Sequence, residues 1–406
     1  MRFLFRPPEQ AAAELLTLPW TQPLEEWVDP RLVDVPQRGI SRHVVRFASV
    51  SGVVWAFKEI PERLARKEYG VLRALNSQGL PAVQVLGVVV DRAELDAILV
   101  TRFLPYSTSY RALFSTPRGV RMTERLLDSL VVLLARLHLA GVFWGDCSLS
   151  NTLFRMDAGL LAAYLVDAET SEQHAQISDR IRGRDLELAH ERMGGELMDL
   201  AAGGLLPPRV DPIAVADDLV VRYDRLWEEL TREEVLPPDE QRYRIGARVR
   251  RLNELGFDVE EIELVETGEG SRLKVAIQVA GPGHARHELS GLTGLDVQEN
   301  QASRLLNDIQ SYRAWQERVS GEPVGMHVAA LHWLQDVYQP VVRAIPASLG
   351  GRLEPAEVFH EVLEHRWYLS EAAARDVGTS QAARSYFAKV LPEVPVGFAA
   401  PPPRPA

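Results

Sequence analysis

The order of the apolar segments constrains the fold of this chain most, because short strand-like segments come first and long helical segments follow. Strands are predicted at 53–60, 82–90 and 95–104, where apolar and β-branched residues are bounded by turn residues. A helix is predicted at 61–75, between the first two strands, and a long apolar helix covers about 121–140. A sheet followed by helices predicts a two-lobed α+β domain.

The segment GGLLPPRVDP at 203–212 divides the chain, because clustered glycine and proline end helices and favour extended linkers. The expected units are an N-terminal lobe at about 30–104 and a C-terminal lobe at about 105–205, both within a domain at 1–205, a mostly helical domain at 206–390, and a disordered proline-rich tail at 391–406. Within the second domain we expect helices at about 213–230, 238–255, 297–318, 326–343 and 354–375, and a small β-hairpin around 267–270.

Composition argues against several classes of protein. Hydrophobic residues make up 46% of the chain and charged residues 25%, as in soluble globular proteins. No segment approaches the roughly 18 uncharged apolar residues of a membrane span, and the N-terminus lacks the apolar core of a signal peptide, so we expect a cytoplasmic protein. The single cysteine, Cys147, cannot form an internal disulfide. The net charge of −11 disfavours binding to nucleic acid.

Strand 53–60 places a lysine among small apolar residues. A period of two puts Lys58 on the same face as Val54 and Ala56. In the next helix Glu68 lies inside an apolar stripe, so it should face inward, where a carboxylate is costly unless it is paired. Lys58 is the nearest cation with a matching orientation. For this pair taken alone, an exposed lysine and an exposed glutamate remain the alternative.

The segment HLAGVFWGDCSLSNTLF at 138–154 is more specific. Asp146 and Asn151 lie five residues apart in a loop between a helix and a strand, and Asp167 ends an apolar strand 21 residues after Asp146. Phosphoryl transfer needs a carboxylate to orient the acceptor hydroxyl, and carboxylate and amide oxygens to hold magnesium. These residues could instead be turn formers that satisfy their own backbone. Because Lys58 and Glu68 precede them in the matching order, we favour the functional interpretation.

In this order, the segments WAFKEI, KEYGVLRAL, LHLAGVFWGDCSLSNTLF and LVDAE resemble the protein-kinase-like superfamily, in particular the bacterial Kdo/WaaP-type lipopolysaccharide kinases and small-molecule kinases. The resemblance covers about the first half of the chain. It implies a phosphotransferase that uses ATP and Mg²⁺. Asp146 would be its catalytic base, Lys58 would contact the α- and β-phosphates, and Glu68 would pair with Lys58. Asn151 and Asp167 would ligate Mg²⁺.

The resemblance also implies where the nucleotide binds. The segment 98–104, which includes Thr101, would line the adenine, with Val54 and Ala56 packing against the ring. The phosphate-covering loop falls at 37–47, where Gly39 and Ser41 would grip the phosphates. Asp185 resembles the buried aspartate that braces the catalytic loop in this superfamily, but we favour the alternative, a charge on a helix surface.

Several positions depart from the family pattern. Ser148 stands where a lysine or histidine is common, which removes one charge near the transferring phosphoryl group, and Gly145 replaces an arginine. Ala168 and Glu169 replace Phe and Gly after the metal-binding aspartate. Two functions therefore remain open. One is an active kinase acting on an unidentified hydroxyl of a protein, sugar or lipid-linked acceptor. The other is a nucleotide-binding pseudokinase whose C-terminal domain recruits a partner. The retained lysine and metal ligands favour the kinase.

The C-terminal half resembles domain of unknown function 4032, which is fused behind kinase-like domains mainly in actinobacteria and implies no activity. Its helix at 297–318 carries a polar ridge of Asn300, Arg304 and Asp308, which we interpret as a solvated or interdomain face rather than a ligand site. An arginine-rich helix at about 238–255 is interpreted as a solvated helix rather than a surface for nucleic acid.

Overall fold

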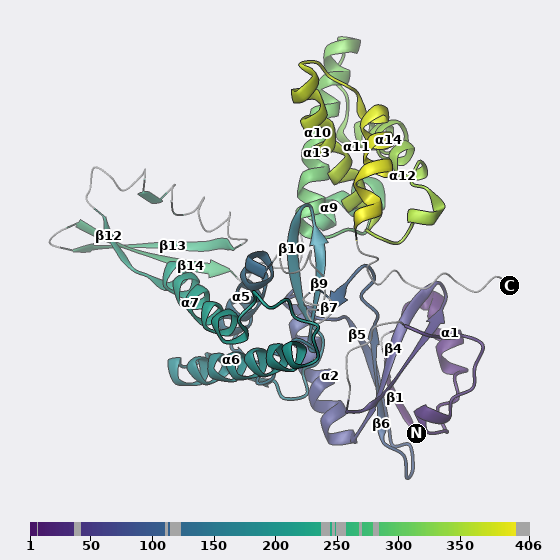
Figure 1. Cartoon of the computed structure of the whole chain (residues 1–406), viewed down its shortest axis with the longest axis vertical. Helices are drawn as coiled ribbons and strands as arrows, with labels where there is room; N and C mark the ends of the chain where they lie inside the picture. The colour runs from purple at the N-terminus through teal and green to yellow at the C-terminus, as the bar shows by residue number, and fades with distance from the viewer. Residues whose placement is uncertain are drawn as a thin grey trace.

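The computed structural model describes residues 1–5, 7–35, 42–109, 113, 123–236, 244–245, 248, 257–267, 270–278 and 284–394. In these ranges a sheet-rich N-terminal lobe is followed by a C-terminal lobe with long helices and then by a separate bundle of helices, with one β-hairpin extending from the side (Figure 1). No helix in the described ranges is both long enough and apolar enough to cross a membrane.

The N-terminal lobe is built on a six-stranded sheet with the strand order β1-β5-β6-β4-β3-β2. Its strands are β1 (Arg2–Phe5), β2 (Leu32–Val33), β3 (Val44–Val50), β4 (Val53–Ile60), β5 (Val85–Val90) and β6 (Ala97–Arg102). All neighbouring strands are antiparallel. The three strands predicted from the sequence are confirmed as β4, β5 and β6, whereas β1, β2 and β3 were not predicted.

The two faces of this sheet bury different side chains. On β4, Trp55 and Phe57 are buried in a cluster that includes Trp20 and Trp27, next to helix α1 (Glu9–Leu16). The other face packs against helix α2 (Glu62–Ser77), which buries Glu68 together with its apolar stripe. The first 27 residues therefore complete the N-terminal lobe, although the sequence interpretation began that lobe at about residue 30.

The C-terminal lobe combines two long helices with short strands. Its elements are α5 (Thr123–Leu139), α6 (Asp179–Ala202), β7 (Thr108–Ser109), β8 (Val142–Phe143), β9 (Thr152–Asp157), β10 (Leu160–Leu165) and β11 (Glu172–Gln173). Strands β9 and β10 form a hairpin whose two-residue turn, Ala158 and Gly159, has positive φ at both positions, as a type I′ turn requires. This hairpin carries Asn151 just before its first strand and Asp167 just after its second.

Helix α7 (Pro212–Thr231) packs with the C-terminal lobe. Tyr223, on the face that α7 turns toward α5 and α6, is fully buried in the core that those helices share. The Gly- and Pro-rich segment at 203–212 does separate α6 from α7, but the shared core continues beyond it to Leu230. The segment at 203–212, which we expected to be a linker between domains, is thus a turn between two packed helices.

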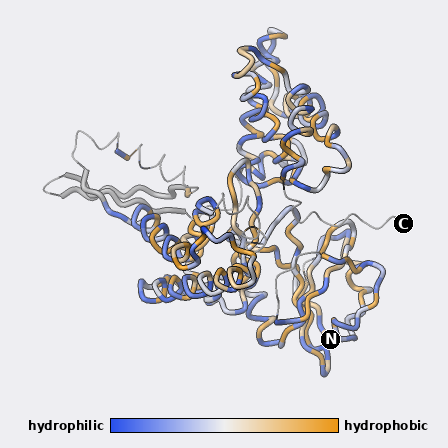
Figure 2. The backbone as a smooth tube through the Cα atoms, in the orientation of Figure 1, coloured by the Kyte–Doolittle hydropathy of each residue, from blue (hydrophilic) through white to orange (hydrophobic). Residues whose placement is uncertain are grey.

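The C-terminal domain has a hydrophobic core of its own, which includes Trp333, Phe359 and Tyr386. Its helices are α9 (His284–Thr293), α10 (Glu299–Ser320), α11 (Met326–Trp333), α12 (Gln339–Arg343), α13 (Pro355–Ala373) and α14 (Thr379–Lys389). Hydrophobic and hydrophilic residues alternate along them (Figure 2), as expected for helices with one buried face. The helix predicted at 326–343 is α11 and α12 joined by the π-helical segment η2 (Leu334–Tyr338), while α9 and α14 were not predicted.

The predicted hairpin is present as β13 (Asp258–Thr267) and β14 (Gly270–Gln278), with β12 (Glu234–Leu236) pairing with β14. Three short 3-10 segments complete the described elements: η1 (Leu24–Glu26), η3 (Ala347–Leu349) and η4 (Leu391–Glu393). The arginine-rich segment and the tail beyond 394 lie largely outside the described residues. Within that segment, Arg248 is buried and donates hydrogen bonds to the carbonyls of Glu229 and Arg232, so a solvated position is wrong for this arginine.

The C-terminal domain holds the turn of the β9–β10 hairpin through hydrogen bonds in both directions. The buried carboxylate of Glu357, on α13, accepts the amide N–H groups of Ala158 and Gly159 at 2.6 and 2.7 Å. In return, Asp157 accepts N–H groups of Asn300 and Gln301 at the N-terminus of α10. A carboxylate is stabilised at a helix N-terminus and by turn amides. The interdomain interpretation is therefore confirmed for Asn300.

The rest of the ridge stays within the C-terminal domain. Arg304 contacts His360, and Asp308 accepts a hydrogen bond from the indole of Trp333 at 2.7 Å. The member of this ridge that contacts the preceding domain is therefore Asn300, in the first turn of α10.

We expect the interface at Glu357 to make folding depend on pH. Burial raises the pKa of Glu357 to about 7, although Gln301 and the two turn amides oppose this. The folded protein therefore binds the proton of Glu357 more tightly than the unfolded chain does. The contribution of this proton to the free energy of unfolding is fully present below pH 4.5 and is lost as the pH rises to about 7. Between pH 5 and pH 8, Glu357→Gln should remove roughly 3 kcal/mol of the pH dependence of unfolding in urea.

The matched control is Glu364→Gln, because Glu364 is exposed on the same helix. This variant should keep the full pH dependence. Part of the slope also remains in Glu357→Gln, since burial raises the pKa of Glu68 to about 7 as well. Identical slopes in Glu357→Gln and wild type would contradict the assignment.

Candidate active site

The predicted lysine and carboxylates meet between the two lobes. Lys58, on β4, places its Nζ 3.1 Å from Oε2 of Glu68, on α2, and 2.7 Å from Oδ2 of Asp167, just after β10. Glu169 approaches the same ammonium at 3.6 Å. The backbone N–H of Ala168 donates to the other oxygen of Glu68 at 3.3 Å. Three segments far apart in the sequence thus converge on one cation, and Glu68 faces inward as predicted.

Burial and charge oppose each other in this cluster. Burial lowers the pKa of Lys58, but the carboxylates of Glu68 and Asp167 together outweigh it and raise the pKa overall. Lys58 is therefore a permanent cation at neutral pH. Burial, followed by repulsion from Asp167, raises the pKa of Glu68 to about 7, while Lys58 acts in the opposite direction. The positive charge of Lys58 offsets the free-energy cost of burying the Glu68 carboxylate.

The catalytic-loop candidates lie next to this cluster. Nδ2 of Asn151 donates to Oδ2 of Asp146 at 2.9 Å, so these two side chains face each other. The backbone N–H of Val166 donates to the carbonyl of Asn151 at 3.1 Å, and the indole of Trp144 donates to the carbonyl of Asp167 at the same distance. The loop at 144–151 and the segment at 166–167 are therefore fastened together at two points.

Asp185 braces the catalytic loop from helix α6. It is fully buried and accepts the backbone N–H groups of Trp144 and Gly145 at 2.7 and 2.8 Å, so the helix-surface alternative is wrong. Gly145 has a φ of +77°, and a Cβ there would lie 2.8 Å from the ring of Phe143. This geometry explains why a glycine occupies the position.

Sequence reasoning missed two members of this buried network. His138, near the end of α5, lies 3.1 Å from Asp185 through Nε2, and its Nδ1 lies 2.6 Å from the hydroxyl of Tyr223 on α7. A histidine inside an otherwise apolar helix was the available sign for His138. Tyr223 had no such sign, because its role depends on α7 packing against α5.

The residues expected around the nucleotide are only partly described. Gly39 and Ser41 lie outside the described residues. Ala56 on β4 pairs directly with Thr101 on β6, so both side chains share the sheet face that carries Lys58, and the carbonyl of Val54 accepts the N–H of the first residue after β6. The structure therefore brings Val54, Ala56 and Thr101 together at one end of the sheet, and the adenine site that the resemblance implies there remains a prediction.

The side chains available for a metal fit magnesium. In the described ranges, no group of three or more His, Cys, Asp or Glu residues could hold a metal by itself. Asp167 and Asn151 offer one carboxylate and one amide oxygen, both hard ligands. Mg²⁺ is commonly bound through one or two protein oxygens, with water and substrate phosphates completing the octahedron. Such a donor set suits a metal that arrives with the nucleotide.

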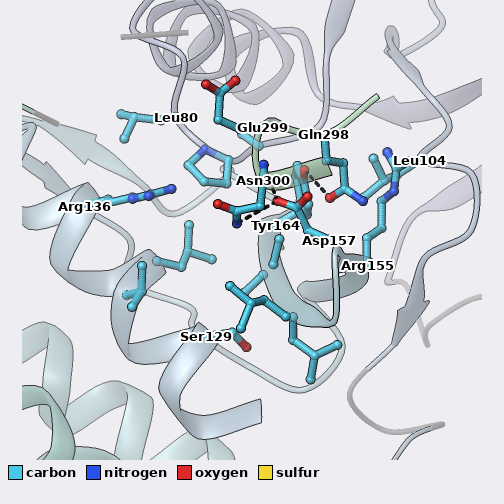
Figure 3. A pocket seen from close by; sticks show the side chains of 18 of the residues that line it. Leu80, Leu104, Ser129, Arg136, Arg155, Asp157, Tyr164, Gln298, Glu299 and Asn300 are labelled. Atoms are coloured by element: carbon cyan, nitrogen blue, oxygen red, sulfur yellow. Dashed lines mark hydrogen bonds between the residues drawn. The ribbon is translucent and has the colours of Figure 1, made fainter. Parts of the chain in front are cut away.

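A large cavity lies elsewhere. It has a volume of about 1950 Å³ and is lined by residues of α5, β10, α10 and the segment after β6, among them Leu104, Arg136, Tyr164 and Asn300 (Figure 3). None of the five residues predicted to carry the chemistry lines it. The Lys58 ammonium and the carboxylates that it contacts therefore lie apart from this cavity.

Comparisons with known proteins agree with this division of the chain. Residues 47–199 match the lipopolysaccharide kinase (Kdo/WaaP) family, and residues 225–391 match the domain of unknown function DUF4032. The resemblance found in each half of the sequence is thereby confirmed. The two-lobed α+β arrangement, followed by a mostly helical domain, is confirmed as well. A search of curated proteins returns no match.

Two solved structures are similar to this chain. One is described as WaaP in complex with acyl carrier protein, at 18% identity and a TM-score of 0.38, covering 63% of this chain and 99% of that chain. The other is the BubR1 kinase domain, at 16% identity and a TM-score of 0.31, covering 42% of this chain and 59% of that chain.

Proposed function

We propose that this chain transfers the γ-phosphoryl group of Mg²⁺-bound ATP to a hydroxyl group of an acceptor. The observation that carries the proposal is the position of Lys58, whose ammonium lies between the buried carboxylate of Glu68 and the carboxylate of Asp167. A lysine anchored in this way is a fixed positive charge, and phosphoryl transfer depends mainly on such positioned charges. The match to a kinase family over residues 47–199 supports the same reaction class.

In this proposal each residue has one task. Lys58 binds the α- and β-phosphate oxygens while Glu68 holds it in place. Asp167 and Asn151 hold Mg²⁺, which neutralises phosphate charge when it is bound. Asp146 accepts the proton of the acceptor hydroxyl as that oxygen bonds to the γ-phosphorus. The bond between the γ-phosphorus and the bridging oxygen breaks, and its electron pair leaves with ADP.

Turnover of ATP tests the proposal before any acceptor is known. The purified chain should release ADP from Mg²⁺-ATP, and Asp167→Ala should reduce this release at least tenfold because it removes the metal-binding carboxylate. Thermal unfolding provides a second readout. Mg²⁺-ATP at 100 times its dissociation constant should stabilise the wild type by about 2.7 kcal/mol.

The same two measurements separate the alternatives. Metal-dependent stabilisation by ATP without any ADP release would support a nucleotide-binding pseudokinase. Neither stabilisation nor turnover would remove nucleotide chemistry from the account.

A further inference from the structure

Helix α6 approaches the catalytic loop at a second point besides Asp185. Nε of Arg192 lies 3.4 Å from Oδ1 of Asp146. Arg192 comes seven residues after Asp185, which is two helical turns, so both side chains leave the same face of α6. Asp185 holds the backbone of the loop at Trp144 and Gly145, and Arg192 contacts the side chain of the next residue, Asp146.

The two oxygens of Asp146 have different partners. Oδ2 accepts the amide of Asn151 at 2.9 Å, and Oδ1 faces the guanidinium of Arg192. In the described part of the chain, no other cation pairs with Asp146. Ser148 cannot pair with Asp146 as Arg192 does. It is buried and uncharged, and its hydroxyl accepts the backbone N–H of Asn151 at 3.2 Å.

We propose that Arg192 is a positioning residue for phosphoryl transfer, which orients the Asp146 carboxylate toward the acceptor hydroxyl. This inference rests on the proposed function. The Asp146 side chain is only 14% exposed, whereas Arg192 is 55% exposed, so the guanidinium lies at the solvent side of the carboxylate, where an acceptor enters. Arg192 contacts Oδ1 as an ion pair at 3.4 Å, so this oxygen keeps a lone pair that can accept a hydrogen bond from that hydroxyl.

The charge of Arg192 also bears on the transfer itself. When Asp146 takes the acceptor proton, it becomes neutral, and the guanidinium loses its anionic partner. An arginine does not release its own proton, so its charge remains beside Asp146 throughout the transfer. A helix that follows the loop thus supplies a positive charge next to Asp146, where Ser148 has none.

A matched pair of arginines on α6 tests the proposal. Arg184 is 57% exposed and pairs with Glu187 at 3.1 Å, so it resembles Arg192 in exposure and pairing but lies away from Asp146. Arg192→Ala should lower kcat for ADP release from Mg²⁺-ATP by about 10- to 100-fold, since small misplacements of a reacting group cost factors of this size. The KM for ATP should stay within about twofold, and Arg192→Lys should be intermediate. Arg184→Ala should match wild type.

The outcomes are separable. If Arg192→Ala turns over like Arg184→Ala, the inference on Arg192 is overturned and the proposed function stands. If the wild type releases no ADP, the proposed function fails and the inference fails with it. Exposed ion pairs contribute little to stability, so neither variant should lower the thermal midpoint appreciably. If Arg192→Ala does lower the thermal midpoint, Arg192→Gln is measured instead. A loss of kcat that only matches the fraction of unfolded protein would contradict a positioning role.

Discussion

Asp146→Asn should abolish most of the turnover while nucleotide binding is retained, which is the largest effect that we expect from a single substitution. Asparagine keeps the size of the side chain but cannot accept the proton of the acceptor hydroxyl. General-base catalysis typically contributes about 10²- to 10⁴-fold, so kcat for ADP release should fall by roughly 10³-fold. Asp146 contacts Asn151 and Arg192 and not the Lys58 cluster, so the dissociation constant for Mg²⁺-ATP should change by less than about threefold.

The control for this substitution is Asp199→Asn. Asp199 is exposed on α6, and exchanging its charge tests whether any loss of negative charge near this helix lowers the rate. Turnover should stay at the wild-type level. An Asp146→Asn variant that keeps more than a tenth of wild-type turnover would contradict the assignment of Asp146 as the base.

Lys58→Met should remove both nucleotide binding and a large part of the stability. The substitution leaves Glu68 buried without the ammonium that balances it, and breaking such a pair costs about 3 kcal/mol in the free energy of unfolding. Removal of one preorganised charge at a reacting group costs about 10²- to 10³-fold in rate. Urea unfolding and the kinetics of ADP release measure the two effects separately.

The double variant Lys58→Met, Glu68→Gln separates stability from function. The second substitution removes the buried charge, so most of the lost stability should return, as a double-mutant cycle would detect. Turnover should not return, because the phosphates still lack their cation. If the single variant binds ATP with wild-type affinity, the triphosphate does not lie at Lys58.

Sequence patterns predicted the pairing of Lys58 with Glu68 because this contact depends on the local structure of two consecutive elements. The period of β4 and the apolar stripe of α2 placed Lys58 and Glu68 face to face, and the structure has them 3.1 Å apart. The loop between α5 and β9 likewise brought Asp146 and Asn151 together. The catalytic and metal-binding roles of these residues remain predictions that the experiments above test.

What the sequence did not predict depends on contacts between distant segments. The N-terminal strand β1 joins the sheet through β5, some 80 residues later, and no local pattern encodes that pairing. Arg192 is recognisable only from its seven-residue spacing to Asp185, and the sequence interpretation had favoured a surface position for Asp185. Linkers are also ambiguous, since the proline-rich segment before α7 joins two packed helices rather than two domains.

The contact between the two family-matched parts of the chain has a consequence for the C-terminal domain. Its α10 and α13 hold the turn of the hairpin whose other end carries Asn151 and Asp167. The polar ridge at Asn300 is therefore occupied by the kinase-like domain of the same chain. A surface that recruits another partner, which remains a prediction for this domain, has to lie on other faces of its helices.

Anomalous scattering from manganese tests the central claim most directly. Crystals would be grown with Mn²⁺ and a non-hydrolysable ATP analogue, because Mn²⁺ replaces Mg²⁺ at oxygen ligands and is visible at its absorption edge. The account predicts manganese bound to the carboxylate of Asp167 and the side-chain oxygen of Asn151, with the phosphates against Lys58. A nucleotide bound away from Lys58, or manganese bound to neither residue, would contradict it.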